Sequence, residues 1–235
     1  MHMGELVNKL IGYAESISDE SIRKVTLGIL TQPTLSFLDA KPIVGFLDSP
    51  AAPRKHHSFS GGLLLHTIGV VEASVRIREY VEMVYGLKAD RDLVVAAALL
   101  HDIFKFYQYR PDEIEGGYKS REDWYLSHDY SIIGELARRG APEKLIRVVA
   151  EVHGLQPFTT IEGLIVHLAD SLDARLGDVL QQTLLGKLRA LDKEGCNPYK
   201  VMSEKARSDG PEKVFERAFS PVDIVVSDFK KYCGG

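Results

Sequence analysis

Cysteine, long apolar runs and blocks of like charge are all scarce in this sequence. Only Cys196 and Cys233 occur among 235 residues, and their spacing is not typical of a metal site. So few cysteines do not make a disulfide scaffold, and we expect a cytoplasmic protein in which neither thiol has a role. No apolar run reaches the roughly 18 residues of a membrane span, so the sequence predicts no membrane partner.

The net charge excludes a further class of function. The formal net charge is −4, and the sequence has no long basic block. Proteins that bind extended nucleic acid are usually basic, because they neutralise a row of phosphates. We therefore expect any phosphate-bearing partner to be attracted locally, by a metal or by a small basic cluster.

Apolar residues recur with helical spacing over most of the chain. No repeat, low-complexity tract or linker interrupts the pattern, so one all-α domain is predicted. The expected helices are two over 4–30, short pieces around Pro33 and Pro42, and longer ones over 63–85, 91–102, 124–139, 142–153 and 161–180. Beyond residue 192 the pattern weakens. We expect short helices over 197–208 and 211–219, and either a strand or a helix over 223–227.

The strongest chemical signal lies where an apolar run ends. The run from Leu93 to Leu100 is followed directly by His101 and Asp102. Each of these ionisable residues needs a partner, because burial without one is costly, and a divalent metal satisfies both. Neighbouring side chains on a helix point about 100° apart, so they reach one ion only near the axis or past the end of the run.

Histidines on apolar helix faces supply further candidate ligands. Five histidines occupy such positions, together with two aspartates in similarly apolar stretches: His66, His101, His128, His153, His167, Asp102 and Asp170. One histidine on an apolar face is usually a satisfied core residue, but five with two carboxylates favour metal binding. Mixed imidazole and carboxylate ligation suits Mn²⁺, Fe, Co²⁺, Ni²⁺ or Zn²⁺ rather than Ca²⁺.

Two other groups of residues have open interpretations. The loop 48–60 contains the densest basic cluster, which either grips a phosphate beside the site or is simply solvated: Arg54, Lys55, His56 and His57. The segment 106–123 is expected to be an exposed loop at the mouth of the site. The aromatic residues of this region either stack on a base or form a wall: Phe104, Phe106, Tyr107, Tyr109 and Tyr118.

Three segments resemble the signature of the HD superfamily of metal-dependent phosphohydrolases. They are Gly61-Gly-Leu-Leu-Leu-His-Thr67, Leu99-Leu-His-Asp-Ile-Phe-Lys105 and His167-Leu-Ala-Asp-Ser-Leu-Asp-Ala174. Within the superfamily, the segment from Ser49 to Leu64 is most similar to the HD domain of YhaM-type 3′→5′ exoribonucleases. The resemblance implies an all-α, HD-domain helical bundle with the metal site between helices. It divides the chain into N-terminal helices packed on the core (1–48), the HD core (49–190) and a C-terminal helical extension of the same domain (191–235).

The chain departs from the family pattern at two places. Phe104 stands where members commonly have glycine or another small residue. The YhaM-type enzymes also carry an N-terminal OB-fold that holds single-stranded nucleic acid, where this chain has helical periodicity. These differences leave the hydrolytic core intact and favour a small substrate over a polynucleotide.

The resemblance also implies which residues do the chemistry. His66, His101, Asp102 and Asp170 bind a first metal, and His128 and His153 bind a second one that Asp102 bridges. We expect two divalent ions per chain, chosen from manganese, iron, cobalt, nickel, zinc and magnesium. The implied catalytic residues are Asp102 and Lys105, with Lys105 as a clamp on the phosphate. The candidate substrate contacts are Lys105, His167, Arg54, Lys55, His57 and Asp173, of which His167 and Asp173 alternatively hold a metal ligand in place.

These expectations combine into one predicted function. The chain is predicted to be a metal-dependent phosphohydrolase that cleaves a phosphoester of a nucleotide or short oligonucleotide by a metal-activated water. Its partners are a phosphate-bearing small molecule or short single-stranded nucleic acid, and a second copy in a homo-oligomer. One alternative is a 3′→5′ exoribonuclease without its own OB-fold. Another is a non-catalytic regulatory module that binds metal and nucleotide, against which the complete ligand set argues.

Overall fold

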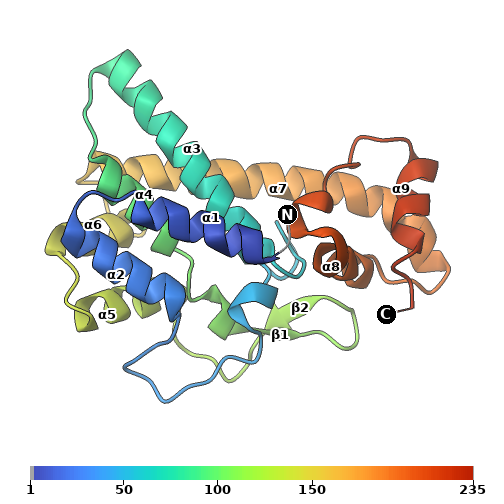
Figure 1. Ribbon diagram of the computed structural model, residues 1–235. Helices are drawn as coiled ribbons and strands as arrows, with labels where there is room; N and C mark the ends of the chain where they lie inside the picture. Colours follow the sequence, from blue (N-terminus) through green and yellow to red (C-terminus); the bar gives the residue numbers. More distant parts are fainter. Residues whose placement is uncertain (1–2, 235) are drawn as a thin grey trace.

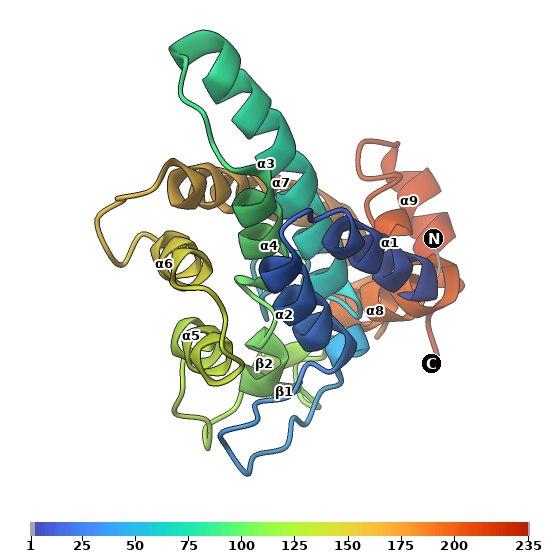
Figure 2. The same cartoon turned by 60° about the vertical axis from the view of Figure 1, so that its left-hand side comes forward.

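Helix α7 (Ile161–Lys193) runs through the whole molecule and joins its two halves (Figure 1). The computed structural model describes residues 3–234. One half is built from α1 (Met3–Glu15), α2 (Glu20–Thr31), α3 (Gly62–Tyr85), α4 (Arg91–Leu100), α5 (His128–Arg138) and α6 (Glu143–Glu151). The other half holds α8 (Pro198–Asp209) and α9 (Val222–Lys230), which pack on the second part of α7 (Figure 2). The all-α prediction is confirmed.

Helix α4 is the centre of the larger half. Every residue from Leu93 to Leu100 is buried, because α2, α3, α6 and α7 all pack around this helix. An apolar run without a polar face is stable only in such a position. The end of α4 is therefore held rigidly in the middle of the bundle, and the residues that follow Leu100 emerge between the surrounding helices.

Polar residues cap the helices as the sequence indicates. The Asp19 carboxylate accepts from the backbone N–H groups of Ser21 and Ile22 at the start of α2. Asp90 caps α4 and Asn197 caps α8 in the same way. Such caps satisfy N–H groups that have no partner inside the helix, and each contributes about 1 kcal/mol.

Several expected boundaries are wrong. The helix predicted over 91–102 ends at Leu100, so His101 and Asp102 lie in the turn beyond it. No helix forms around Pro33 or Pro42, where turns and bends lead to the short 3₁₀ helix η1 (Phe46–Asp48), because each proline removes a backbone donor. Residues 211–219 form only the 3₁₀ helix η3 (Pro211–Lys213). The segment 223–227 belongs to the helix α9.

The segment 106–123 is not an exposed loop. It contains the end of the 3₁₀ helix η2 (Lys105–Gln108) and a small antiparallel hairpin, in which β1 (Tyr109–Pro111) pairs with β2 (Tyr118–Ser120). The aromatic side chains of this region are all buried: Phe104, Phe106, Tyr107, Tyr109 and Tyr118. Phe104, Phe106 and Tyr107 belong to the main apolar core, and Tyr109 and Tyr118 pack from the hairpin onto Val44. These contacts favour the interpretation of the aromatic residues as a wall.

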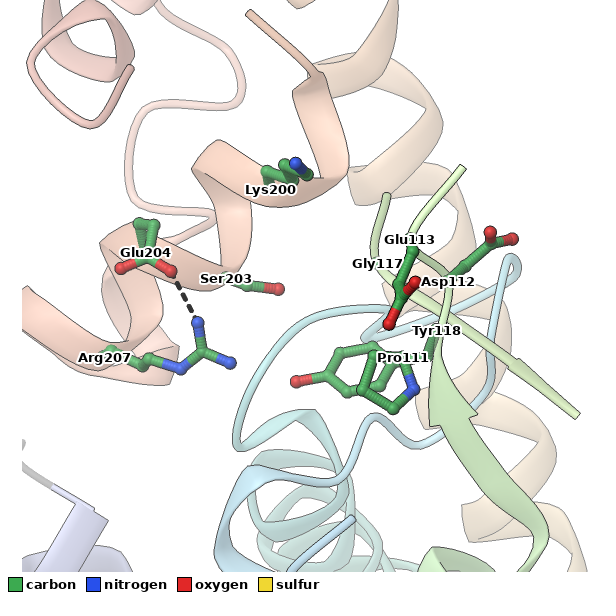
Figure 3. Close-up of a pocket in the computed structure, with 9 residues that line it drawn as sticks. All are labelled: Pro111, Asp112, Glu113, Gly117, Tyr118, Lys200, Ser203, Glu204 and Arg207. Carbon is green, nitrogen blue, oxygen red and sulfur yellow. Dashed lines mark hydrogen bonds and ion pairs between the residues drawn. The ribbon is translucent and has the colours of Figure 1, made fainter. Parts of the chain in front are cut away.

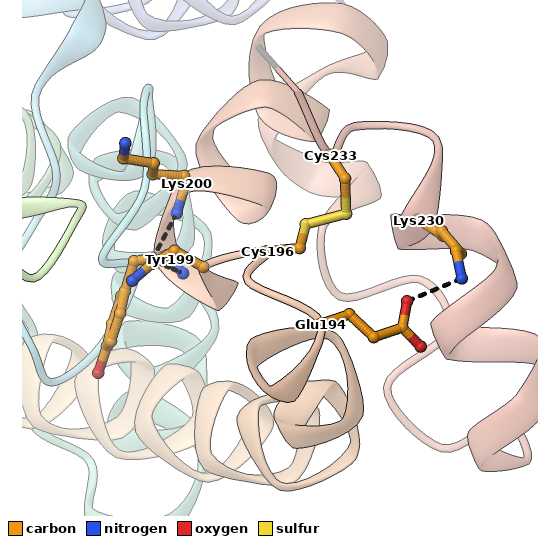
Figure 4. Close-up of a disulfide and its surroundings, with 7 residues drawn as sticks. Glu194, Cys196, Tyr199, Lys200, Lys230 and Cys233 are labelled. Carbon is orange, nitrogen blue, oxygen red and sulfur yellow. Dashed lines mark hydrogen bonds and ion pairs between the residues drawn. A yellow bond between two sulfur atoms is a disulfide. The ribbon is translucent and has the colours of Figure 1, made fainter.

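The two cysteines form a disulfide, which corrects the expectation that they have no role. Cys196 follows α7 and Cys233 follows α9, and their Cα atoms lie 5.5 Å apart (Figure 4). An ion pair between Glu194 and Lys230 lies beside the bond. The disulfide ties the end of the chain to the smaller half, and cysteine usage no longer argues for a reducing compartment.

Among residues 3–234, no helix combines the length and the apolar character needed to cross a bilayer.

Candidate metal centre

His66 is placed by a tight contact at the start of α3. Gly61 has a left-handed backbone with φ of 75°, and a Cβ on Gly62 would lie 2.0 Å from the carbonyl oxygen of His57. Only glycine allows the loop before α3 to press on the helix in this way. His66 lies on the second turn of α3, fully buried, and its ring faces the end of α4.

The imidazoles of His66 and His101 each present Nε2 as an acceptor. His101 Nδ1 lies 2.9 Å from the carbonyl oxygen of Ala98, which only accepts, so Nδ1 carries the proton. His66 Nδ1 lies 2.7 Å from Asp173 Oδ2 and donates to that carboxylate. In the neutral ring the other nitrogen then has a free lone pair, which is the form that a metal ligand needs.

Four side chains converge around these two nitrogens. His66 Nε2 lies 3.3 Å from Asp102 Oδ2 and 3.2 Å from Asp170 Oδ1. His101 Nε2 lies 3.5 Å and 3.7 Å from the same two oxygens. Their ligand atoms all lie within 4.8 Å of one another, a spacing that suits a shared ion. We call His66, His101, Asp102 and Asp170 the first ligand set.

A second ligand set uses the other oxygen of Asp102. Asp102 Oδ1 lies 3.2 Å from His128 Nε2 and 3.6 Å from His153 Nε2. His128 begins α5, and His153 lies two residues after the end of α6. Because Oδ2 faces the first set and Oδ1 faces the second, the one carboxylate is placed between two neighbouring positions for an ion.

Asp129 belongs to this second set and was missed by the sequence analysis. Its Oδ1 lies 3.0 Å from His153 Nε2 and 3.3 Å from His128 Nε2. The signal was the dipeptide His128-Asp129, which repeats His101-Asp102. Asp102, His128 and His153 present ligand atoms within 4.8 Å of one another, and Asp129 joins them through its contacts with both histidines. We therefore define the second ligand set as Asp102, His128, Asp129 and His153.

Gln108 controls the orientation of the His128 ring. Its side-chain amide nitrogen lies 3.1 Å from His128 Nδ1. With the amide placed the other way round, its oxygen accepts a hydrogen bond from Nδ1–H, and His128 Nε2 is then a free acceptor. Gln108 is thus the counterpart of Asp173 at the second ligand set.

Unpartnered polar atoms provide the test of whether metals fit here. Within the described part of the chain, six buried atoms of the two ligand sets have no hydrogen-bond or ion-pair partner that fits a neutral ring: His66 Nε2, His101 Nε2, Asp102 Oδ1, His128 Nε2, Asp129 Oδ1 and His153 Nε2. Asp102 Oδ2 pairs with Lys105. Buried polar atoms are otherwise nearly always paired. Divalent metal bound among these residues would supply the missing partners, so the residues fit a metal.

Charge in the cluster also suits metal binding. Burial raises the pKa of Asp102, but Lys105 and the surrounding imidazoles outweigh it and hold that pKa well below its usual range. Asp170 is likewise kept ionised: burial raises its pKa, but the neighbouring His101 and His66 imidazoles lower it further. Burial lowers the pKa of His153, which favours the neutral ring. Asp102, Asp170 and His153 are therefore in the forms that bind metal. Burial lowers the pKa of His66, but the three neighbouring aspartates outweigh it and raise that pKa, so a bound ion would replace a proton of this ring.

Lys105 lies one turn beyond the ligand pair, where the sequence placed it. The side chain is partly buried, and its Nζ lies 2.5 Å from Asp102 Oδ2. Burial lowers the pKa of Lys105, but Asp102 beside it reverses the effect and raises the pKa above its usual value. The ammonium is therefore a fixed positive charge at the cluster, and its role as a phosphate clamp stays a prediction.

Asp173 and His167 occupy different surroundings on α7. Asp173 bonds His66, and a Cβ on Gly69 would lie 2.0 Å from Asp173 Oδ1, so the glycine makes room for the carboxylate. His167 Nδ1 donates to the carbonyl oxygen of Val152, 2.7 Å away, and Val152 directly precedes His153 in the chain. The contacts place both side chains in supporting positions; their contact with substrate stays a prediction.

The basic loop divides into outward and inward parts. Arg54 pairs with Asp112 on the hairpin at 2.8 Å and lies over the ring of Tyr199, and Lys55 is exposed. His56 and His57 are buried, and both ring centroids lie within 5.7 Å of that of His66. Burial lowers the pKa of each to about 3, so both are neutral. The histidines lie against the first ligand set, and the predicted substrate roles of Arg54, Lys55 and His57 stay predictions.

The pocket drawn in Figure 3 lies apart from this cluster. It has a volume of ≈330 Å³ between the hairpin and α8, and none of the described residues that line it belongs to either ligand set. Arg207 at its edge is already paired with Glu204. This pocket therefore does not locate the chemistry.

Comparison with known proteins finds similarity to metal-dependent phosphohydrolases over the part of the chain that contains both ligand sets. Residues 63–175 match the model of the HD domain, a span that contains both ligand sets. Dihydroneopterin 2′,3′-cyclic phosphate phosphodiesterase of Methanocaldococcus jannaschii is 32% identical over 240 residues, covering 96% of this chain and 95% of the relative. The 3′-5′ exoribonucleases YhaM of Geobacillus sp. and Bacillus subtilis are each 25% identical, covering 75% and 73% of this chain but only 54% of each enzyme. No solved structure matches the chain. The chain belongs to the HD-domain family of metal-dependent phosphohydrolases.

Proposed function

We propose that this phosphohydrolase opens a 2′,3′-cyclic phosphodiester of a nucleotide-like molecule, with two divalent ions held by the ligand sets that share Asp102. The observation that carries the proposal is the division of the Asp102 carboxylate, whose two oxygens face two different groups of ligands. The full-length relative from Methanocaldococcus jannaschii, by its name, acts on such a cyclic phosphate and supports the choice of substrate.

The proposed reaction consumes one water. Its oxygen bonds to phosphorus, one of the two ester bonds of the ring breaks, and the released sugar oxygen takes up a proton. The product is a phosphomonoester. Bound divalent ions would acidify the water and neutralise the phosphoryl oxygens. The chain itself holds Asp102 ionised and orients the His66 and His101 rings through Asp173 and the Ala98 carbonyl. It also places the Lys105 ammonium beside Asp102, where a phosphoryl oxygen can meet it.

Metal content combined with turnover tests this proposal. Protein purified without chelator or affinity nickel is analysed for metals and assayed on adenosine 2′,3′-cyclic monophosphate with manganese added. We expect about two ions per chain and metal-dependent formation of the monophosphate. Asp102→Ala is expected to lose both ions and turnover while it still unfolds cooperatively. Full activity in Asp102→Ala would contradict the proposal.

Asp129 offers a sharper test of the second ion. Asp129→Asn removes one charged donor of the second ligand set and leaves the first set intact. We expect about one ion per chain and a large loss of turnover. If Asp129→Asn still binds two ions tightly, Asp129 is not a metal ligand. Elemental analysis distinguishes the outcomes, and also identifies the metal among manganese, iron, cobalt, nickel, zinc and magnesium.

A 3′→5′ exoribonuclease is the second candidate function. It is favoured by the two YhaM relatives, whose similarity covers about half of each enzyme. A nuclease that follows a phosphate backbone loses activity steeply as salt is added, whereas hydrolysis of a mononucleotide does not. Assays of single-stranded RNA and the cyclic mononucleotide over a salt series separate the two functions. Metal and nucleotide binding without turnover would favour the regulatory module instead.

Assembly as a homo-oligomer and a cytoplasmic location belong to the same proposal. Exposed apolar residues follow one face of α7 at helical spacing: Leu168, Leu172, Leu176 and Val179. Such a stripe can pack against its own copy in an antiparallel pair. Sedimentation velocity with Leu172→Glu tests the dimer. The thiol state of Cys196 in protein extracted under alkylating conditions bears on the location.

A further inference from the structure

An apolar pocket adjoins the second ligand set. It has a volume of ≈180 Å³ and lies between α5 and α6, which are side by side in both views of the fold. Asp129 and His153 form part of its lining, and Asp129 Oδ1 and His153 Nε2 are two of the unpartnered atoms of the centre. A molecule that reacts at the metal centre therefore has this pocket directly beside its reacting group.

The lining of the pocket favours a group that is largely apolar and carries no negative charge. Ile133 on α5 and Val149 on α6 supply apolar walls, and among the described residues that line it there is no lysine or arginine. A second phosphate would be unpaired here, so the pocket is not a continuation of a track for a nucleic-acid backbone. Two of the lining side chains, Tyr130 and Leu155, are 67% and 63% exposed, so both can be reached from solvent.

The size of the pocket limits what it holds. Pockets for whole drug-sized ligands measure about 300–1,000 Å³, so a volume of ≈180 Å³ suits one ring system rather than a complete nucleotide. A nucleotide-like substrate whose phosphate and sugar lie at the metal centre has one ring system left to place, and the pocket is large enough for it. Gln156 adds an amide, with donors and an acceptor, to the lining.

We propose that this pocket binds the planar heterocyclic ring of the substrate, with Tyr130 stacked on the ring face and Gln156 bonded to the ring edge. The inference rests on the proposed cyclic-phosphate hydrolysis and names the group that distinguishes one cyclic phosphate from another. Tyr130 can stack on any aromatic ring, so it does not distinguish one heterocycle from another. The Gln156 amide can, because it bonds only to a ring edge with matching hydrogen-bond donors and acceptors.

The test compares two cyclic phosphates that differ in the ring. Adenosine 2′,3′-cyclic monophosphate carries a heterocycle, and glycerol 1,2-cyclic phosphate has the same five-membered phosphodiester without one. In Tyr130→Ala we expect kcat/KM for the adenosine substrate to fall about tenfold relative to kcat/KM for the glycerol substrate, which corresponds to the loss of one stacked base. Ala150→Leu, which narrows the pocket from α6, is expected to change the ratio in the same direction.

Tyr85→Ala is the matched control, since Tyr85 is 64% exposed at the far end of α3 and lines neither this pocket nor a ligand set. We expect it to leave the ratio of the two substrates unchanged. Calorimetric titration with adenosine 2′-monophosphate gives a readout without turnover, and Tyr130→Ala is expected to weaken binding about tenfold.

The outcomes separate the two proposals. An equal loss on both substrates, or no loss on either, in Tyr130→Ala would overturn the ring pocket while cyclic-phosphate hydrolysis stands. Wild-type protein that hydrolyses neither cyclic phosphate would overturn the proposed function and the ring pocket with it. A selective loss together with weaker binding of the monophosphate would support both.

Discussion

Each imidazole of the first ligand set is fixed through the nitrogen that faces away from the centre. His66 donates to Asp173, and His101 donates to the carbonyl oxygen of Ala98. A backbone carbonyl cannot be removed by substitution, but the carboxylate can. Asp173 thus offers a way to ask how much the orientation of one ligand contributes to the metal centre.

Replacing Asp173 is expected to weaken metal binding without unfolding the protein. In Asp173→Ala the His66 ring loses the acceptor that fixes its tautomer, and loss of such a partner typically lowers metal affinity about 10- to 100-fold. Competition between the protein and a chelator for Mn²⁺ measures the affinity. Thermal unfolding in excess chelator measures the cost to stability separately, since the buried His66 Nδ1–H also loses its acceptor, a loss of about 1–3 kcal/mol.

The matched control for this experiment is Asp178→Ala, which removes a carboxylate from the same helix. Asp178 pairs with Arg175 at the surface and touches no ligand. Its metal affinity is expected to equal that of the wild type. An unchanged affinity in Asp173→Ala as well would mean that packing alone orients His66.

How well single residues could be predicted depended on their local pattern. His101 and Asp102 stand out because two ionisable side chains interrupt an apolar run. Asp129 did not stand out, because it follows a polar, aromatic segment where a carboxylate is ordinary. Its role comes from the approach of α5 to the end of α6, which no local spacing encodes. The basic residues Arg54 and Lys55 could not be oriented for the same reason.

At the scale of elements, helices with caps and a periodic apolar face were predicted well, and short irregular elements were not. Asp19, Asp90 and Asn197 mark their helices in the sequence because a cap bonds to its own neighbours. The hairpin formed by β1 and β2 has only three residues in each strand. It is stable because Tyr109 and Tyr118 are buried against the rest of the protein, which is a tertiary effect.

Glu151 fixes the loop between α6 and α7, which carries His153. Its buried carboxylate accepts from the backbone and hydroxyl groups of both Thr159 and Thr160, at 2.5–3.1 Å. In Glu151→Gln the amide nitrogen cannot accept, so some of these donors lose their partner. We expect the free energy of unfolding at pH 7 to fall by about 1–3 kcal/mol, measured by urea titration.

The difference between wild type and Glu151→Gln is expected to depend on pH. Burial raises the pKa of Glu151, but its hydrogen bonds outweigh burial and lower the pKa below the usual 4.5. A carboxylate with a lowered pKa stabilises the folded state above pH 4.5, and this contribution is lost as the pH falls through the folded value. The two proteins should therefore converge in stability at low pH. Glu143→Gln, exposed at the start of α6, is the control and should match the wild type throughout.

At the scale of the whole molecule, the chain has two main apolar cores joined by α7. The larger core surrounds α4 and supports the metal centre, and it includes residues from the N-terminal helices, such as Leu6 and Leu10. The smaller core lies between the second part of α7, α8 and α9, with Leu188, Met202 and Phe229 among its members. The sequence could not show this division, because α7 is one uninterrupted helix through both. The predicted boundaries at residues 48 and 190 stay predictions.

The disulfide belongs to the smaller core, and this position predicts what its removal does. Cys196 and Cys233 close a loop of 37 residues that contains α8 and α9. By the loop-closure entropy of the unfolded chain, such a crosslink contributes about 3–4 kcal/mol. The double variant Cys196→Ser with Cys233→Ser is therefore expected to unfold at a lower temperature. Metal content is expected to be unchanged, since both ligand sets lie in the larger half.

Reductant provides the internal control for this prediction. Dithiothreitol should lower the unfolding temperature of the wild type to that of the double variant and leave the variant itself unaffected. If the smaller half unfolds locally before the larger one, the rate of amide hydrogen exchange will rise in α8 and α9 of the variant. The amides of α4 will stay protected. An equal effect of reductant on both proteins, or loss of metal from the double variant, would contradict the assignment of the disulfide to the smaller half alone.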